Sequence, residues 1–458
     1  MKRLLVLLMV LMCVALCAGA EDADYDTLYS YEVVNDTVTI TKYVGQETDV
    51  VVPAEIGGFP VTAIGVGAFD CDMGWTIRSI QLPEGITAID DEAFLNCGNL
   101  KELELPQSLV TLGSKAFQYS GITSIHIPAN VTNIGAGVFA SAENLESVTI
   151  DPQNAAFEMI GGVLYDVAGK RAVSSVTQLI GTSHVVPEGT VAIDDYAFYD
   201  CYSLASVTLP EGLKTIGDFA FAANNTELKA LHIPDSVTAI GSTAFFGSGL
   251  EHIALPKSLK TLGDRAFTHC YSLQSVEISA GITEIKENTF AYCSGLKTAT
   301  IPSSVKVIGE GAFTDCALET ITLPYGVERI GDWAFAGCKK LKEIAIPGTV
   351  SSIGGDSFAS CNQDMKVIVE EGSEAEKFFA QNGADIEYGE FAPPVLPGDS
   401  TGDGNVDIFD ALAILQFAVG WDVELNEEAG DVDDDGKCDV FDALLILQYS
   451  VGWDVELK

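Results

Sequence analysis

Basic residues are scarce in this sequence: 24 Lys and Arg stand against 66 Asp and Glu in 458 residues, a formal net charge of −42 at pH 7. A chain with that charge repels polyanions, so nucleic acid and anionic membrane surfaces are excluded as natural partners, while cations are favoured. The acidity is densest in residues 399–458, which contain sixteen Asp or Glu and only two Lys. Bound cations are therefore expected first at this end of the chain.

Histidine is also rare. The five histidines are His126, His184, His232, His252 and His269. None has a partner at a spacing typical of a metal site or of a catalytic triad. His126 and His232 lie several repeats apart and are expected to be solvated surface residues. The sequence therefore predicts a protein that is not an enzyme.

Long hydrophobic runs are missing after the first twenty residues, so no segment reaches the ~18 apolar residues that span a bilayer. The start of the chain has a basic pair, an apolar run over 4–16 and the small residues Ala18-Gly19-Ala20. This pattern predicts a secretory signal peptide over 1–20, cleaved before Glu21, and a secreted, extracellular protein. The alternative is a lipoprotein anchor at Cys17, which is preceded by Leu16 where a small residue is usual.

Cysteine is present, but not in the pattern of a disulfide framework. Of the eleven cysteines, Cys13 and Cys17 lie in the signal segment, which leaves an odd number. Seven follow a Phe by three residues and Cys71 follows Phe69 by two; other repeats place Ser120, Ala142 or Ser248 in this position. The position needs a small, buried side chain, so we expect a row of buried free thiols rather than disulfides.

What the chain has in abundance is a repeated unit. Its phenylalanines recur every 22 to 25 residues with one longer gap, at Phe69, Phe94, Phe117, Phe139, Phe198, Phe221, Phe245, Phe267, Phe290, Phe313, Phe335 and Phe358. One such unit cannot bury its apolar face alone, whereas stacked units share a continuous core. The period therefore predicts a solenoid.

Each unit reads like VTAIGSTAFFGSGLEHIALPKS at 237–258: an Ile-Gly step, an Ala-Phe pair, a Leu, and an alternating segment that ends at Pro. Alternation predicts a strand with Leu, Ile or Val pointing inward, in a parallel sheet. The outward positions are mostly Thr, Ser and Ala without an aromatic row, which argues against carbohydrate binding. Protein binding, or no specific ligand, is favoured.

The repeated I-G-x-x-A-F-x-x-C-x-x-L and L-x-L-P motifs closely resemble those of the BspA-like leucine-rich repeat family, over about residues 25–388. The resemblance implies a mainly β fold, a right-handed leucine-rich-repeat solenoid with a parallel sheet, and a non-catalytic scaffold for adhesion or protein binding.

The expected domain organisation is as follows. After the signal peptide comes an N-terminal β cap at 21–60, then repeats over 61–388 with an insertion at 153–190 and a C-terminal cap at 370–388 that starts a short helix. The insertion reads as hairpins with turns at 161–162 and 168–170, interpreted as a structural protrusion or, alternatively, as a recognition element. A Pro-rich linker at 389–398 leads to a last domain at 399–458.

Two acidic loops begin this last domain, DSTGDGNVDIFD at 399–410 and DVDDDGKCDVFD at 431–442. A Ca²⁺ ion takes oxygen ligands from positions 1, 3, 5, 7, 9 and 12 of such a loop, with Gly at position 6. The candidate ligands are Asp399, Thr401, Asp403, the Asn405 carbonyl, Asp407 and Asp410 in the first loop, and Asp431, Asp433, Asp435, the Lys437 carbonyl, Asp439 and Asp442 in the second. Gly404 and Gly436 fill the turn position, and the neutral Thr401 predicts weaker binding by the first loop.

A helix is expected after each loop, at 409–420 and 441–452, each closed by Gly, while no helix precedes the first loop. Two such half-EF-hands in about sixty residues resemble a type I dockerin, a small all-α domain. The resemblance implies two Ca²⁺ ions and docking onto a cohesin module of a scaffolding protein, as in cellulosomes. The residues it places against the cohesin are Ile408, Phe409, Leu415, Gln416, Val440, Phe441, Leu447 and Gln448; the alternative is that Phe409 and Phe441 belong to the core.

The sequence therefore favours a secreted, non-catalytic repeat protein that is attached through its dockerin to a cellulosome or a cell-surface complex and binds an unknown macromolecule. Two alternatives stay open: a hydrolase-associated cellulosome subunit acting on plant polysaccharide, and a free secreted adhesin.

Overall fold

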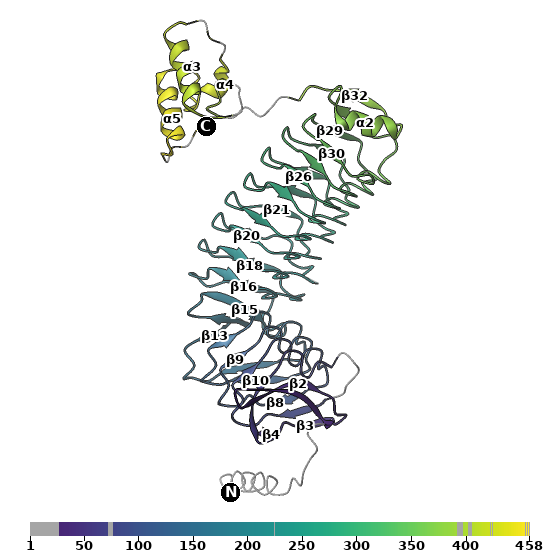
Figure 1. Cartoon of the computed structure of the whole chain (residues 1–458), viewed down its shortest axis with the longest axis vertical. Helices are drawn as coiled ribbons and strands as arrows, with labels where there is room; N and C mark the ends of the chain where they lie inside the picture. Colours follow the sequence, from purple (N-terminus) through teal and green to yellow (C-terminus); the bar gives the residue numbers. More distant parts are fainter. Residues whose placement is uncertain are drawn as a thin grey trace.

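The computed structural model describes residues 27–71, 77–223, 225–391, 397–401, 405–421, 423, 425–453, 455 and 457. Figure 1 shows a long stack of coils built from short strands, with helix α2 at its C-terminal end, and a helical unit made of α3, α4 and α5. No helix within the described ranges is long and apolar enough to cross a membrane.

The strands that in most coils precede a proline form five parallel sheets along the stack, in which residues pair with their equivalents in the next coil, as Ser275 does with Thr298. Ile80 and Ile253 on these strands are buried, whereas Gln81, His126 and His232 are exposed. The predicted parallel sheet, with its apolar side chains inward, is confirmed. Its strands are β3 (Asp49–Val51), β6 (Ser79–Gln81), β8 (Glu102–Leu103), β10 (Ser124–Ile127), β12 (Ser147–Ile150), β16 (Ser183–Val185), β18 (Ser206–Thr208), β21 (His252–Ala254), β23 (Ser275–Glu277), β25 (Thr298–Thr300), β27 (Thr320–Thr322), β29 (Glu343–Ile346), β31 (Lys366–Val369) and β32 (Ile386–Tyr388).

A second set of short parallel strands, in three sheets, ends at the Ile or Leu of each Ile-Gly step, or at the Ile that Asp90, Asp194 or Lys286 follows in three of the coils. Its strands have two residues each, which is too short for an alternating pattern to reveal them in the sequence. They are β7 (Ala88–Ile89), β9 (Thr111–Leu112), β11 (Asn133–Ile134), β17 (Ala192–Ile193), β19 (Thr215–Ile216), β20 (Ala239–Ile240), β22 (Thr261–Leu262), β24 (Glu284–Ile285), β26 (Val307–Ile308), β28 (Arg329–Ile330) and β30 (Ser352–Ile353).

The repeated phenylalanines form a column inside the coils. Rings of successive coils lie nearly parallel, with centroids 5.4 Å apart between Phe267 and Phe290 and 5.5 Å apart between Phe313 and Phe335. Eleven of the twelve are fully buried, and Phe358 in the last coil is half-buried against Phe379 of α2 (Glu374–Gln381). The column is the core of the solenoid.

The insertion forms β13 (Phe157–Ile160), β14 (Val163–Asp166) and β15 (Arg171–Ser175), joined by turns where the sequence predicts them. The interpretation as a protrusion is wrong, because β15 pairs in parallel with β17 and takes the place of a coil. Val163 and Tyr165 face the C-terminal part of the core, whereas Leu164 faces the N-terminal part. The hairpins therefore form a layer that divides the hydrophobic core into two clusters.

Both ends of the stack are covered. At the N-terminal end β1 (Tyr29–Val34) and β2 (Thr37–Tyr43) form a hairpin, and β4 (Glu55–Ile56) pairs with β5 (Phe59–Ile64), which joins β2 to the short-strand ladder. At the other end, the predicted short helix is α2, whose N-cap Ser373 accepts a hydrogen bond from the Glu376 N–H at 3.1 Å. These covers leave no bare coil at either end of the described solenoid.

All nine cysteines among the described residues are reduced in this structure. Six of them, Cys97, Cys270, Cys293, Cys316, Cys338 and Cys361, donate to the carbonyl of the Phe in the preceding coil at 3.0–3.2 Å. The expected row of buried thiols is thus present, and in most of these coils the S–H adds a second hydrogen bond to a Phe carbonyl that already accepts the backbone N–H three residues further on.

Candidate functional site

The C-terminal unit consists of two loop-and-helix halves with the same local design. Helices α3 (Ile408–Ala418) and α5 (Val440–Ser450) pack on each other around Ile414 and Ile446, and α4 (Glu427–Gly430) lies between them in the chain. Both helices are followed by a glycine with positive φ, Gly420 at 83° and Gly452 at 81°, as expected for helices closed by Gly. The predicted helices are confirmed to within two residues.

An aspartate pair begins each helix. In the second half, Asp439 accepts a hydrogen bond from the Phe441 N–H and Asp442 accepts one from the Asp439 N–H, both at 2.8 Å. Asp407 and Asp410 make the same bonds in the first half, at 2.7 and 2.8 Å. These carboxylates satisfy N–H groups that a helix start leaves free, which fixes where each loop ends.

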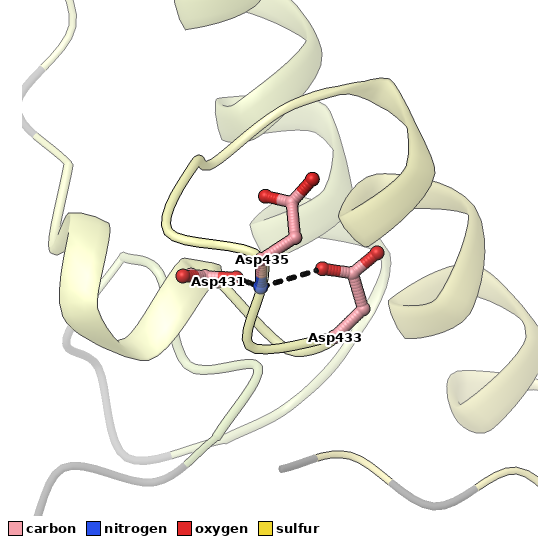
Figure 2. A group of neighbouring side chains, drawn as sticks. All are labelled: Asp431, Asp433 and Asp435. Carbon is pink, nitrogen blue, oxygen red and sulfur yellow. Dashed lines mark hydrogen bonds between the residues drawn. The ribbon is translucent and has the colours of Figure 1, made fainter.

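The second loop brings three carboxylates to one place. Oxygens of Asp431, Asp433 and Asp435 all lie within 4.8 Å of one another (Figure 2). The Asp435 N–H donates to both Asp431 and Asp433 at 3.1 Å, and Gly436 turns the chain with a φ of 82°. Convergent carboxylate oxygens on a tight loop are the donor set that Ca²⁺ prefers. The residues of this loop fit a calcium ion.

Asp442 joins this loop to its helix. It is 1% exposed, and one of its oxygens accepts hydrogen bonds from the Val432 N–H at 2.9 Å and the Asp433 N–H at 3.3 Å. Partial desolvation, followed by the negative charges of Asp442 and Asp435, raises the pKa of Asp433. A bound cation removes that repulsion, so the loop favours its own metal electrostatically. Lys437 is exposed, with its Nζ 3.8 Å from Asp435 Oδ2, and is predicted to contribute only its carbonyl oxygen.

The first loop is described in part. Thr401 donates from both its N–H and its hydroxyl to Asp410 Oδ1, each at 2.9 Å, and Asp399 is buried. Its predicted ligand Asp403 and its turn residue Gly404 lie outside the described residues. The described part of this loop therefore shares the link between loop and helix with the second loop, but its carboxylate cluster stays a prediction.

Four of the predicted cohesin-facing residues are large apolar side chains on the surface. Exposed fractions are 59% for Ile408, 64% for Phe409, 55% for Val440 and 70% for Phe441. The alternative that the two phenylalanines belong to the core is therefore wrong. Exposed apolar side chains in matching places on a small domain are typical of a protein contact.

The other four predicted residues lie deeper. Leu415 and Leu447 pack against the small core of this unit, and Gln416 and Gln448 are half-buried. They sit about two turns along their helices from the exposed phenylalanines. Any contact that Leu415 and Leu447 make with a partner is therefore through the edge of the helix rather than its most exposed face.

Further exposed apolar residues extend each patch and were missed in the sequence. Leu412, Val419 and Trp421 follow Phe409 along and beyond α3, and Leu444, Val451 and Trp453 follow Phe441 in the same way. Positions 409, 412, 416 and 419 share one helix face, as do 441, 444, 448 and 451. The signal was available, because the string VGWDVEL occurs at both 419–425 and 451–457.

The solenoid also carries an exposed aromatic cluster that the sequence reading missed. His269 stacks on Tyr292 with a centroid distance of 4.7 Å, packs at an angle on Tyr271 at 5.5 Å, and contacts Phe246 edge to face at 5.1 Å. Tyr271 is 61% exposed and Tyr292 41% exposed. This aromatic cluster lies on the turns that carry the phenylalanine column and not on the long-strand face, where an aromatic row was sought.

Comparison with known families identifies the repeats. The model of the BspA type leucine rich repeat region matches six copies, over residues 61–162, 191–319 and 306–380. The chain belongs to the BspA-type leucine-rich repeat family. The repeat model does not match residues 163–190 of this BspA-type protein, where the hairpin layer replaces a regular coil. The dockerin type I domain model matches residues 397–449, so the two loop-and-helix halves form a dockerin.

Solved structures agree with this assignment. A leucine-rich repeat protein from Bacteroides ovatus is 26% identical over 81% of this chain and 100% of its own, with a TM-score of 0.50. A leucine-rich repeat protein from Eubacterium ventriosum is 22% identical over 73% of this chain and 93% of its own, with a TM-score of 0.53, and supports the fold. None of the curated proteins matches the BspA-type chain. The families and structures matched are those of repeat proteins, without a catalytic domain.

Proposed function

We propose that this BspA-type protein is secreted and that its dockerin, holding two Ca²⁺ ions, attaches it to a cohesin module of a scaffolding protein in a cellulosome or cell-surface complex. There the solenoid binds another protein and performs no catalysis. The observation that carries this proposal is the dockerin with its exposed apolar patches, since a cohesin is the partner that a dockerin implies.

Calcium makes the dockerin competent to dock. Asp431, Asp433 and Asp435 would hold the ion of the second loop together with the Lys437 carbonyl, Asp439 and Asp442. The ion supplies positive charge that offsets the repulsion among these carboxylates and thereby holds the loop against its helix. The equivalent residues of the first loop, with Asp403 among them, would hold the second ion.

The dockerin presents two alternative docking faces. Phe409 with Leu412 forms one apolar patch and Phe441 with Leu444 forms the other, and the two patches have nearly the same residues in the same helical positions. Large apolar side chains surrounded by polar ones are the usual centre of a protein contact. A cohesin that accepts one face is therefore expected to accept the other after a half-turn of the dockerin.

The aromatic cluster around His269 is the place on the solenoid where we expect its partner. Tyrosine provides large, rigid contact area together with a hydroxyl, and it is enriched at the energetic centres of protein contacts. Tyr271 and Tyr292 are both exposed and come from neighbouring coils, so a partner contacts both at once.

The proposal is tested by capture from the surface proteins of the producing organism. The bait is the full chain, with 5 mM CaCl₂ in one arm and excess chelator in the other, and the matched control is the chain ending at residue 391. Calcium-dependent capture of a cohesin-bearing scaffold by the full chain alone is the expected result. Capture that is unaffected by chelation or by loss of the dockerin contradicts the docking proposal.

The remaining alternatives make different predictions. A free adhesin stays in the culture fluid whether or not residues 392–458 are present, whereas the proposed protein loses retention on the cell or scaffold when they are deleted. A hydrolase-associated subunit would carry activity on plant polysaccharide, so release of reducing sugar by the purified chain would revive that alternative.

A further inference from the structure

Cys71 is one residue out of register with the other thiols of the solenoid. It follows Phe69 by two residues, whereas Cys97 follows Phe94 by three, as do the later cysteines. Cys97 keeps the common arrangement and donates to the Phe69 carbonyl of the preceding coil at 3.0 Å. Cys71 instead donates to the same carbonyl within its own coil, at 3.3 Å. Two thiols are thus directed at one carbonyl from two coils.

The consequence is that their sulfur atoms meet. Cys71 Sγ and Cys97 Sγ lie 2.6 Å apart, and the two side chains are 6% and 1% exposed. Two unbonded sulfurs do not rest at such a separation, which is close to the ~2.05 Å of a covalent S–S bond. The backbone is suitably placed, because the Cys71 N–H donates to the Leu95 carbonyl of the next coil at 3.1 Å. Neither cysteine lies on a strand, but successive coils are stacked at the ~4.8 Å spacing of their paired strands, which is within the Cα separation of ~4.4–6.8 Å that a disulfide needs.

We propose that Cys71 and Cys97 form an intrachain disulfide that joins the first Phe-bearing coil to the second, while the later cysteines remain thiols. Among the described residues, no other pair of cysteine sulfurs has a contact of this length. The later cysteines in register with Cys97 donate to a carbonyl in the coil before them. Cys270 and Cys293 also interact through their side chains, but no sulfur–sulfur contact as short as that of Cys71 and Cys97 joins them.

The oxidant is a disulfide, either a small molecule such as oxidised glutathione or a dithiol oxidoreductase in its oxidised form. The thiolate of one cysteine attacks this disulfide, forming a mixed disulfide and releasing one thiol. The thiolate of the second cysteine then attacks the protein sulfur of the mixed disulfide and releases the second thiol. Two electrons pass from the cysteines to the oxidant, and the two protons leave with its thiols. Because both sulfurs are buried in the finished coil, the exchange takes place during folding.

The test uses the purified full chain, denatured with reductant and refolded with a mixture of reduced and oxidised glutathione. The refolded protein is denatured without reductant, alkylated, digested and analysed by mass spectrometry. We expect a peptide pair linked through Cys71 and Cys97 in most molecules, with a mass lower by two hydrogen atoms than the two reduced peptides, and alkylation of the other seven cysteines of the nine beyond residue 26. Reduction before alkylation removes the link.

Two variants control for the choice of partner. In Cys71→Ser, Cys97 becomes alkylated without reductant and the oxidised and reduced proteins melt at the same temperature. In Cys270→Ser, the Cys71–Cys97 link is retained, and the oxidised protein melts at a higher temperature than the reduced protein, as we expect for the wild type. Serine suits the position of Cys270, since Ser120 and Ser248 occupy the equivalent position in other coils. Alkylation of both Cys71 and Cys97 in most refolded wild-type molecules, or links that scatter over the later cysteines, overturns the proposal. Because the oxidant is supplied in vitro, the result does not depend on secretion or docking.

Discussion

A phenylalanine of this solenoid is buried by residues that are distant in the sequence. Phe267 lies between Phe245, with ring centroids 5.1 Å apart, and Phe290, at 5.4 Å, and it is fully buried. Each ring therefore contributes to the packing of three coils. Removing one leaves a cavity that the neighbouring rings cannot fill without shifting the backbone of their own coils.

We predict that Phe267→Ala lowers the free energy of unfolding by about 3–5 kcal/mol. The measurement is denaturant unfolding followed by circular dichroism. The matched control is Tyr271→Ala, which removes a similar ring that is 61% exposed and is expected to cost less than about 1 kcal/mol. Equal losses in the two variants would mean that the column is not the main source of stability.

A second prediction concerns turn conformation. Thr243 has a φ of 58°, a region that is costly for a β-branched residue, and its N–H donates to the Asp264 carbonyl of the next coil at 2.9 Å. Thr243→Gly should raise the free energy of unfolding by about 0.5–1 kcal/mol, because glycine adopts this φ freely. The same substitution at Thr300, an exposed strand residue, should lower it by a similar amount. Denaturant titration of both variants measures these changes, and a loss of stability in Thr243→Gly would contradict the prediction.

For single residues, the sequence predicts which side chains are buried, but it does not predict which side chains of neighbouring coils contact each other. The 22-to-25-residue period identifies the buried phenylalanines, and the alternation at Ile80 and Gln81 gives the two sides of a strand. The approach of Cys71 to Cys97 and the stacking of His269 on Tyr292 depend on how adjacent coils are set against each other. That alignment is a property of backbone hydrogen bonds between coils, which the composition of one repeat does not reveal.

Among the structural elements, the conformation of the acidic loops depends most on a bound ion. The carboxylates of Asp431, Asp433 and Asp435 converge within 4.8 Å, and the raised pKa of Asp433 reflects partial desolvation and then the negative charges of Asp442, Asp435 and Asp431. Without a cation this convergence is unfavourable, so the order of the loop and of the α5 start is coupled to the ion.

We predict that chelation lowers the helical signal of the dockerin and leaves the solenoid folded. Asp433→Ala should reduce the calcium stoichiometry from two to one, with the first-loop site retained. Isothermal titration calorimetry gives the stoichiometry, and circular dichroism with and without chelator gives the helical change. The matched control is Asp434→Ala, an exposed loop residue that is not among the predicted ligands. Unchanged stoichiometry in Asp433→Ala would remove this residue from the ligand set.

The paired helices lead to a prediction about redundancy. Phe409→Ala and Phe441→Ala should each leave cohesin affinity within about tenfold of the wild type, because the other face stays intact. The double variant should lose more than about a hundredfold, since both apolar centres are then gone. Surface plasmon resonance on an immobilised cohesin measures all three. A large loss in one single variant alone would indicate a single docking face.

The elements were predictable to different degrees. Helices α3 and α5 follow from their loops, the apolar pattern and the closing glycines, whereas α4 has four residues and no apolar period to detect. The hairpin layer was located by its turns, but its burial was not foreseen. Tyr165 and His184 continue the phenylalanine column there, with a hydrogen bond of 2.7 Å between them, and neither residue matches the repeat motif.

At the scale of the whole molecule, the two ends of the stack determine whether the protein stays monomeric. A solenoid with an open end presents a complete apolar layer to another copy. Helix α2 prevents this at the C-terminal end by placing Phe379, which is 3% exposed, against Phe358.

We predict that Phe379→Asp causes concentration-dependent self-association, because a buried charge detaches α2 from the last coil. Analytical ultracentrifugation of the full chain with calcium present detects the assembly. The matched control is Lys377→Asp, which places the same carboxylate on the exposed face of the helix and should stay monomeric relative to wild type. A monomeric Phe379→Asp protein would show that β32 alone suffices as a cover.

The turns beside the phenylalanine column have a wider consequence. Glu92, Lys115, Tyr196, Phe219, Thr243, Arg265, Asn288 and Trp333 all occupy one position and all have a φ between 53° and 59°. Most of their N–H groups donate to a carbonyl of the next coil. The positive φ is therefore imposed by hydrogen bonding between coils and does not depend on the type of side chain. Acidic, basic, aromatic and hydroxyl side chains are accepted there alike. This edge can therefore change its chemistry one coil at a time without loss of the fold, which makes it the part of the molecule best suited to acquire new partners.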